Sequence, residues 1–140
     1  MKNTFDTLFT SDPDKSENGT PITFGVNAKG DPVIFYIAEA GCENHEKVQR
    51  KYAKQLERSR HLPARREEII SKIIAESLLI KWEGVLDEKG KEVEPTYENK
   101  LEALRKYKRL YNEIMTIALD HENFIEEDEN PNAEEDTEKN

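Results

Sequence analysis

A wide apolar stripe in the middle of the chain constrains the fold more than any other feature of the sequence. Between residues 69 and 78 the apolar side chains recur at helical spacing, and a further apolar run follows directly. Pro63 is favoured in the first turn of a helix, and Gly84 is favoured just past a helix end. We therefore expect a helix from Pro63 towards Gly84 as the most buried element, with these stripe residues: Ile69, Ile70, Ile73, Ile74, Ser77, Leu78, Leu79, Ile80 and Trp82.

A second helix is predicted upstream of this stripe, from Glu43 onward. Val48, Tyr52 and Leu56 recur every four residues, and Asn44 is available as the N-cap. The other faces of this helix are basic. Residues 47–72 carry nine basic and three acidic side chains, a net charge of +6, so the sequence places a positively charged surface around the first two helices.

A third helix is predicted to run from Thr96 to about Asp120. Its apolar positions follow alternating steps of three and four residues, interrupted only by Lys108. Additional apolar residues widen the stripe, which favours a globular or oligomeric contact over a narrow two-stranded coiled coil. The positions that define the pattern are Tyr97, Leu101, Leu104, Tyr111, Met115 and Ala118, widened by Leu110, Ile114 and Ile117.

A β-hairpin is predicted before the helices. Residues 21–26 and 33–38 are rich in β-branched and aromatic side chains, and the segment 27–32 between them has the composition of a turn. Residues 87–90 form another turn-like sequence, which predicts a short hairpin or loop. The expected fold class is α+β and mainly helical: an N-terminal β-hairpin followed by three main helices, with disordered termini.

Composition divides the chain into three parts. Charged residues make up 36% and hydrophobic residues 35% of the sequence, a high and a low value for a globular protein. We expect a flexible N-terminal arm at 1–20, a single folded domain at 21–125 and a disordered acidic tail at 126–140. The tail carries eight acidic residues and one basic residue, so it accounts for −7 of the net charge of −9.

The sequence offers little for catalysis, metal binding or membrane insertion. Cys42 is the only cysteine, so an internal disulfide or a thiol-based zinc site is excluded. His45, His61 and His121 lie far apart without metal-ligand spacing, and residues 87–90 have too few alternating oxygen ligands for a calcium loop. No apolar stretch reaches membrane-spanning length. We expect no enzyme activity, no catalytic residue, no metal, no cofactor and no membrane contact.

Two parts of the sequence resemble the tail assembly chaperones of long-tailed bacteriophages. In the first part, an apolar helix end runs into Trp82, and a short Asp-and-Gly turn, an apolar residue, a Tyr-containing helix start and a final helix follow it. This part comprises residues 78–85, 87–93 and 96–99 and the helix that ends near Phe124. Residues 35–41 followed by Asn44 resemble the strand and first-helix entry of the same family.

This resemblance implies a function in virion morphogenesis without a catalytic site. Members of that family keep the tape measure protein soluble and help to recruit the major tail tube protein, and then leave the finished tail. The implied partners are therefore the tape measure protein, the major tail tube protein and further copies of the chain in a homo-oligomer. The implied location is the host cytoplasm, and the chain is expected to be absent from the mature virion.

Three groups of residues are candidates for partner binding, each with an alternative interpretation. Trp82 is either a binding anchor or a cover for the core at the end of its helix. The apolar residues of the arm either dock on a neighbouring subunit or fold back on their own chain. The basic residues either grip phosphates or form a solvated face that docks acidic protein segments. The arm group is Phe5, Leu8 and Phe9, and the basic group is Arg58, Arg60, Arg65 and Arg66.

A different function remains open for the basic segment. Two helices around a short turn, with positive charge, are also found in small nucleic-acid-binding regulators. The connector 59–63 lacks the usual glycine and the whole chain is acidic, so we do not expect nucleic acid as the partner. The alternative function is therefore a helical regulator that binds nucleic acid through residues 47–72.

Overall fold

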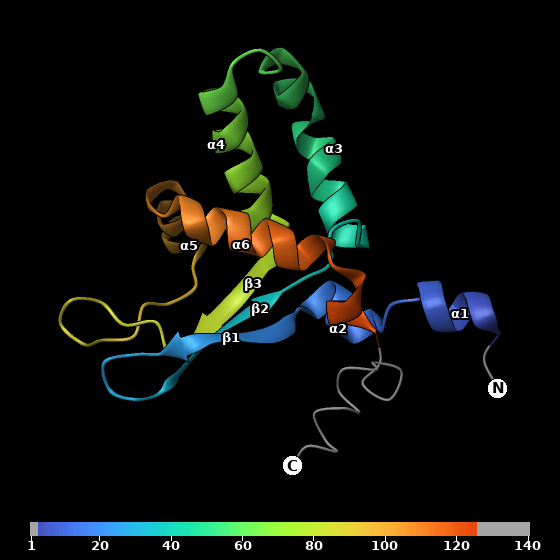
Figure 1. The fold of residues 1–140 in the computed structure, drawn as a ribbon. Helices are drawn as coiled ribbons and strands as arrows, with labels where there is room; N and C mark the ends of the chain where they lie inside the picture. Colours follow the sequence, from blue (N-terminus) through green and yellow to red (C-terminus); the bar gives the residue numbers. More distant parts are fainter. Residues whose placement is uncertain (1–2, 126–140) are drawn as a thin grey trace.

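The computed structural model describes residues 3–125 of the 140-residue chain. A three-stranded antiparallel sheet, in the order β1-β2-β3, lies beneath α6, and α3 and α4 project from this body as a helical hairpin (Figure 1). The predicted α+β, mainly helical class is confirmed. The elements are α1 (Thr4–Phe9), α2 (Pro13–Asn18), β1 (Thr20–Val26), β2 (Pro32–Ile37), α3 (Glu43–Arg58), α4 (Pro63–Ile73), η1 (Ile74–Leu78), β3 (Leu79–Glu83), α5 (Tyr97–Lys106), α6 (Lys108–Leu119) and η2 (His121–Phe124).

The predicted N-terminal hairpin is confirmed as β1 and β2. Its turn is stabilised by the side chain of Asn27, whose Oδ1 accepts hydrogen bonds from the backbone N–H of Lys29 at 2.9 Å and of Asp31 at 3.1 Å. Asn and Asp favour such turns because their short side chains bond to backbone two to four residues away. This local chemistry explains why the hairpin could be predicted from the sequence.

The prediction that the central helix continues towards Gly84 is wrong. Helix α4 ends at Ile73, the π-helical turn η1 follows, and Leu79–Glu83 forms β3 against β2. Phe35 faces Trp82 across the two strands, with ring centroids 5.8 Å apart in an edge-to-face arrangement. Because a short apolar run suits either a buried helix or a buried strand, only pairing with β2 decides this segment.

The loop after β3 forms a short hairpin, as its turn composition predicts. Leu86 and Glu92 form an isolated antiparallel bridge, and the Nε1–H of Trp82 donates a 2.7 Å hydrogen bond to the carbonyl of Val93. An indole N–H removed from water needs such a partner. The loop therefore closes the edge of the core beside Trp82.

The predicted third helix is two helices, because the chain breaks at Tyr107. Thr96 caps α5, since its hydroxyl accepts a hydrogen bond from the backbone N–H of Asn99. Tyr107 has an extended backbone, with φ −117° and ψ 91°, and α6 starts at the next residue. On either side of the break, Arg105 pairs with Glu68 and Lys108 with Glu67 on α4. The apolar periodicity continues from α5 into α6, so the sequence pattern could not reveal the break at Tyr107.

One core unites the sheet with α5, α6 and η1. Strands β2 and β3 contribute four of its buried residues, and η1, α5 and α6 contribute seven. The buried core residues are Phe35, Ile37, Ala38, Cys42, Ile74, Ala75, Leu78, Leu79, Trp82, Leu101, Leu104, Ile114 and Ala118.

Within residues 3–125, no helix is long and apolar enough to cross a membrane.

The segment expected as a flexible arm forms two short helices, and α2 is joined to the end of the described chain. Ser16 donates its hydroxyl to Glu39 at 3.1 Å, and His121 contacts the other oxygen of Glu39 through Nδ1 at 3.2 Å. Lys15 donates Nζ–H to the carbonyl of Ile125 at 3.0 Å. The chain therefore leaves the described fold beside α2, and the predicted tail at 126–140 lies outside the described residues.

The start of α3 is held by residues other than Asn44, so the N-cap prediction is wrong. Cys42 occupies the N-cap position without a side-chain bond. Glu17 of α2 accepts the backbone N–H of Glu43 at 2.8 Å, and the buried His45 accepts the N–H of Gly41 on Nδ1 at 2.9 Å. These tertiary contacts replace a local cap and fix α3 against α2.

Gly84 provides a sharp test of the β2–β3 junction. Its φ is +79°, and a Cβ there would lie 2.2 Å from the carbonyl oxygen of Pro32. Gly84→Ala should lower the free energy of unfolding by about 2–4 kcal/mol, since backbone strain and steric overlap add. Gly30→Ala is the matched control, because φ is +85° there but no atom lies within 4 Å of the added Cβ. Equal losses for the two variants in urea unfolding would contradict the packing described.

A pH-dependent stability follows from His45. Burial lowers its pKa below the ordinary value of 6.5, so the folded state takes up the proton less readily than the unfolded state. The contribution of this group should be complete above that value and decline as the pH falls below it. His45→Gln should therefore lose less stability than the parent chain between about pH 7.5 and pH 5. Identical losses in urea unfolding would reject this assignment.

Candidate partner-binding surface

The α3–α4 hairpin has an apolar contact of its own, separate from the main core. Val48 and Tyr52 of α3 pack against Ile69 and Ile73 of α4, with Leu56 partly buried beside them. These residues occupy the predicted apolar face of α3. The remaining faces of the hairpin are therefore available to carry charge and to meet a partner.

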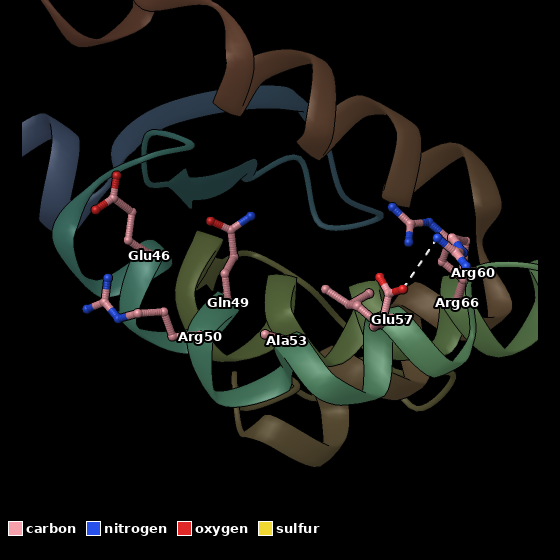
Figure 2. Close-up of a pocket in the computed structure, with 8 residues that line it drawn as sticks. Glu46, Gln49, Arg50, Ala53, Glu57, Arg60 and Arg66 are labelled. Carbon is pink, nitrogen blue, oxygen red and sulfur yellow. Dashed lines mark ion pairs between the residues drawn. The ribbon is translucent and has the colours of Figure 1, made fainter.

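A groove of about 490 Å³ runs along α3 on a face next to this contact (Figure 2). Most of its lining comes from one side of α3, at spacings of three and four residues that align on a helix surface. Arg66 from the first turn of α4 closes one end. We call this feature the α3 groove; it is lined by Glu46, Gln49, Arg50, Ala53, Leu56, Glu57, Arg60 and Arg66.

The α3 groove combines a small apolar centre with charged ends. Ala53 and Leu56 lie in the middle of the groove, and the short side chain of Ala53 leaves room for a side chain of a partner. Arg60 forms an exposed ion pair with Glu57 at 3.4 Å, and Figure 2 shows Arg66 beside Arg60 although the two come from different elements. An apolar floor with polar ends is typical of surfaces that accept an amphipathic helix.

The structure brings together the four arginines predicted to bind a partner. Arg58 ends α3, Arg60 lies in the connecting turn, and Arg65 and Arg66 are in the first turn of α4, all of them exposed. Only Arg60 and Arg66 line the α3 groove. The group therefore forms a positively charged tip of the hairpin, which we call the basic tip.

Phe5, Leu8 and Phe9 lie on α1 and are exposed by 76%, 54% and 72%. Phe5 and Phe9 are neighbours on one face, with ring centroids 6.4 Å apart, as their spacing predicts. No residue of α1 is buried. These side chains do not fold back on the described part of the chain, and they form an apolar surface separate from the α3 groove.

Trp82 is not part of this surface. It is only 6% exposed, its ring packs on Phe35, and its N–H is bonded within the chain. This environment favours the interpretation of Trp82 as a cover for the core. Of the three predicted groups, the basic tip and the arm residues are therefore exposed, whereas Trp82 is buried.

Sequence reasoning missed most of the α3 groove. The periodicity of Val48 and Tyr52 drew attention to the buried face of α3, whereas the groove uses another face with Glu46, Gln49 and Ala53. A signal was present, since residues 46, 49, 50, 53, 57 and 60 recur at helical spacing. Their mixed chemistry resembles that of any solvated helix face, so the spacing alone could not identify a groove.

The described residues do not assemble a recognisable catalytic or metal centre. Among residues 3–125, no cluster of three or more His, Cys, Asp or Glu side chains has the arrangement of a metal site. Burial raises the pKa of the Cys42 thiol, which disfavours the reactive thiolate. His121 and Ser11 both contact Glu39, but Ser11 reaches the same Nδ1 atom that faces the carboxylate. In a hydrolase triad one ring nitrogen faces the carboxylate and the other faces the hydroxyl, whereas here Glu39 and Ser11 contact the same nitrogen of His121.

Comparison with protein families gives one match. The family described as YdaY prophage protein matches residues 41–140, a range that contains the α3–α4 hairpin, β3, α5 and α6. The α3 groove and the basic tip lie wholly inside the matched range, whereas α1 and the β1–β2 hairpin precede it. Comparison with curated proteins and with solved structures gave no match.

Proposed function

Because the chain belongs to the YdaY prophage protein family and is therefore phage-derived, we propose that it is a tail assembly chaperone of a long-tailed phage. In this role it binds and solubilises the tape measure protein and helps to recruit the major tail tube protein. It acts in the host cytoplasm, without catalysis or a cofactor, and is absent from the finished virion. The resemblance of residues 78–124 to the chaperone pattern supports this proposal.

The observation that carries the proposal is the shape and chemistry of the α3 groove. From Glu46 to Glu57 the groove follows about 17 Å of α3, roughly the length of three helical turns, and Arg60 extends it into the connecting turn. An unassembled amphipathic helix exposes an apolar stripe that favours aggregation. The apolar centre near Ala53 and Leu56 would cover part of that stripe, and charged residues at the ends favour a reversible contact.

The exposed arm gives the chaperone a means of self-association. Phe5, Leu8 and Phe9 present an apolar face that the described part of the chain leaves largely exposed. Apolar side chains gathered on one face mark a protein contact more strongly than isolated ones do. In the proposed homo-oligomer, α1 packs on a neighbouring subunit and several α3 grooves line up along one long partner helix.

A second candidate function is favoured by the basic tip. Arg58, Arg60 and Arg65 gather at a helix turn, where they could contact phosphates. A nucleic-acid complex formed this way would weaken steeply with salt, because counterions are released on binding. An apolar groove centre has no evident use in such a complex, so the chaperone function is preferred.

Co-expression with the tape measure protein of the same prophage tests the proposal. The soluble fraction of that protein should rise, and the two proteins should co-purify. Arg60→Glu combined with Arg66→Glu should weaken the complex about tenfold, because reversing two rim charges costs roughly 1–1.5 kcal/mol. The readout is the dissociation constant of the purified complex, alongside the soluble yield.

The matched control reverses two charges elsewhere. Lys29→Glu with Lys91→Glu makes the same change in net charge. Both residues lie in exposed loops at the end of the sheet that is far from the α3–α4 hairpin (Figure 1). This variant should behave like the parent chain. A folded parent chain that leaves the tape measure protein insoluble would count against the proposal, and strongly salt-dependent binding to nucleic acid would then favour the regulator.

The arm can be tested without any partner. Phe5→Ser with Phe9→Ser should convert the parent oligomer to smaller species in sedimentation velocity, because the apolar face of α1 is lost. Asp6→Asn on the same helix is the control and should leave the sedimentation profile unchanged. A parent chain that is monomeric, or an oligomer that survives the double substitution, would exclude self-association through α1.

A further inference from the structure

We propose that the acidic segment 126–140 of this chain occupies the α3 groove and the basic tip, so that a partner has to displace it. The occupant is identified by charge. Residues 126–140 carry eight acidic and one basic side chain, whereas residues 47–72 carry nine basic and three acidic ones. Opposite net charges of −7 and +6 on two segments of one chain attract each other.

The proposed site has five arginines, which are those of the basic tip and Arg50, and two glutamates, Glu46 and Glu57, so its net charge is +3. Within residues 3–125, the side chains of Arg50, Arg58 and Arg66 have no ion pair with an acidic residue. Arg60 pairs only with Glu57, three residues away on the exposed surface, and such pairs contribute little and exchange readily. An acidic segment can therefore bind here without breaking a buried interaction.

The chain also leaves the described fold next to the start of the groove. Ile125 is held by Lys15 of α2, and Glu17 of the same helix accepts the N–H of Glu43 at the first residue of α3. Helix α2 has six residues and is about 9 Å long. Ile125 is thus bonded to the same short helix that contacts the start of α3, near the end of the α3 groove that Glu46 lines.

The length of the segment is sufficient to follow the groove. Glu46 and Glu57 are separated by about 17 Å along α3, and Arg60 follows three residues later in the connecting turn. A segment that begins at residue 126 and continues to residue 140 spans up to about 50 Å when extended. Such a segment reaches from α2 past Ala53 to the basic tip.

Covalent attachment makes this contact effective although each ion pair is weak. A short linker holds the segment at an effective concentration in the millimolar range. The resulting competition regulates the same surface that binds the partner, and this consequence rests on the proposed chaperone function. If the segment covers the groove for about nine-tenths of the time, a partner binds about tenfold more weakly than to the uncovered groove.

A spin label on the segment tests the contact in the full-length chain. Cys42→Ser removes the native thiol, and serine is well suited to the N-cap position that Cys42 holds. Ala133→Cys then carries the label. At low salt the amide NMR signals of Gln49, Ala53 and Arg60 should broaden strongly, whereas those of Lys29 and Gly30 should not.

A tail-neutral variant provides the control. It carries the same label and seven substitutions that leave only Glu138 and Lys139 charged, so the segment has no net charge: Glu126→Gln, Glu127→Gln, Asp128→Asn, Glu129→Gln, Glu134→Gln, Glu135→Gln and Asp136→Asn. The broadening of the groove signals should largely disappear. High salt should have the same effect on the parent segment, because exposed charges are screened. The proposal would be overturned if the broadening were absent from α3, spread evenly over the surface or unchanged in the tail-neutral variant. It would also be overturned if, in a mixture of labelled and unlabelled chains, the label broadened only the signals of other chains.

The regulatory consequence has a separate readout. The tail-neutral variant should bind the tape measure protein about tenfold more tightly than the parent chain, and equal affinities would exclude competition. The label experiment needs no partner, so its outcome does not depend on the chaperone function. Failed co-expression together with broadened groove signals would reject the chaperone function alone, and the reverse pattern would reject the tail contact alone.

Discussion

The packing of Phe35 against Trp82 across β2 and β3 is the contact on which the rest of the structure depends. It fixes β3 in the sheet immediately after the π-helical turn η1, which leaves no linker between sheet and hairpin. The direction of α4, and with it that of α3, is therefore set by the sheet. Gly84 allows β3 to end close to Pro32, since any side chain at this position would overlap the neighbouring backbone.

Much of the fold could be predicted because its signals are local. The turn at Asn27, the helix start at Pro63 and the cap at Thr96 each depend on residues within a few positions of one another. The strand β3 could not be predicted, because its apolar residues continue the pattern of the preceding helix without a break in composition. Tyr107 escaped prediction for a related reason: pairing of α5 and α6 with Glu67 and Glu68 is a tertiary constraint.

The candidate site could likewise be predicted only in part. The arginines and the arm residues were visible from charge and spacing, and the structure locates them at the basic tip and on α1. The α3 groove was not visible, because a groove is a property of two helices and their side-chain volumes. Ala53 matters there only because larger neighbours surround it, and Arg66 only because α4 returns beside α3. Such relations have no counterpart in a single segment of sequence.

The separation of the two apolar clusters explains how a charged hairpin is tolerated. The main core requires no charged residue of the basic tip, and the hairpin's own contact uses only its inner face. Positive charges gathered at one turn repel one another, which costs stability unless an acidic group offsets them. Residues 126–140 carry nearly the opposite charge, and Ile125 before them is bonded to α2, which also contacts the first residue of α3. The proposed tail contact would offset the repulsion at the basic tip, and the proposed partner helix would have to supply acidic groups of its own to replace it.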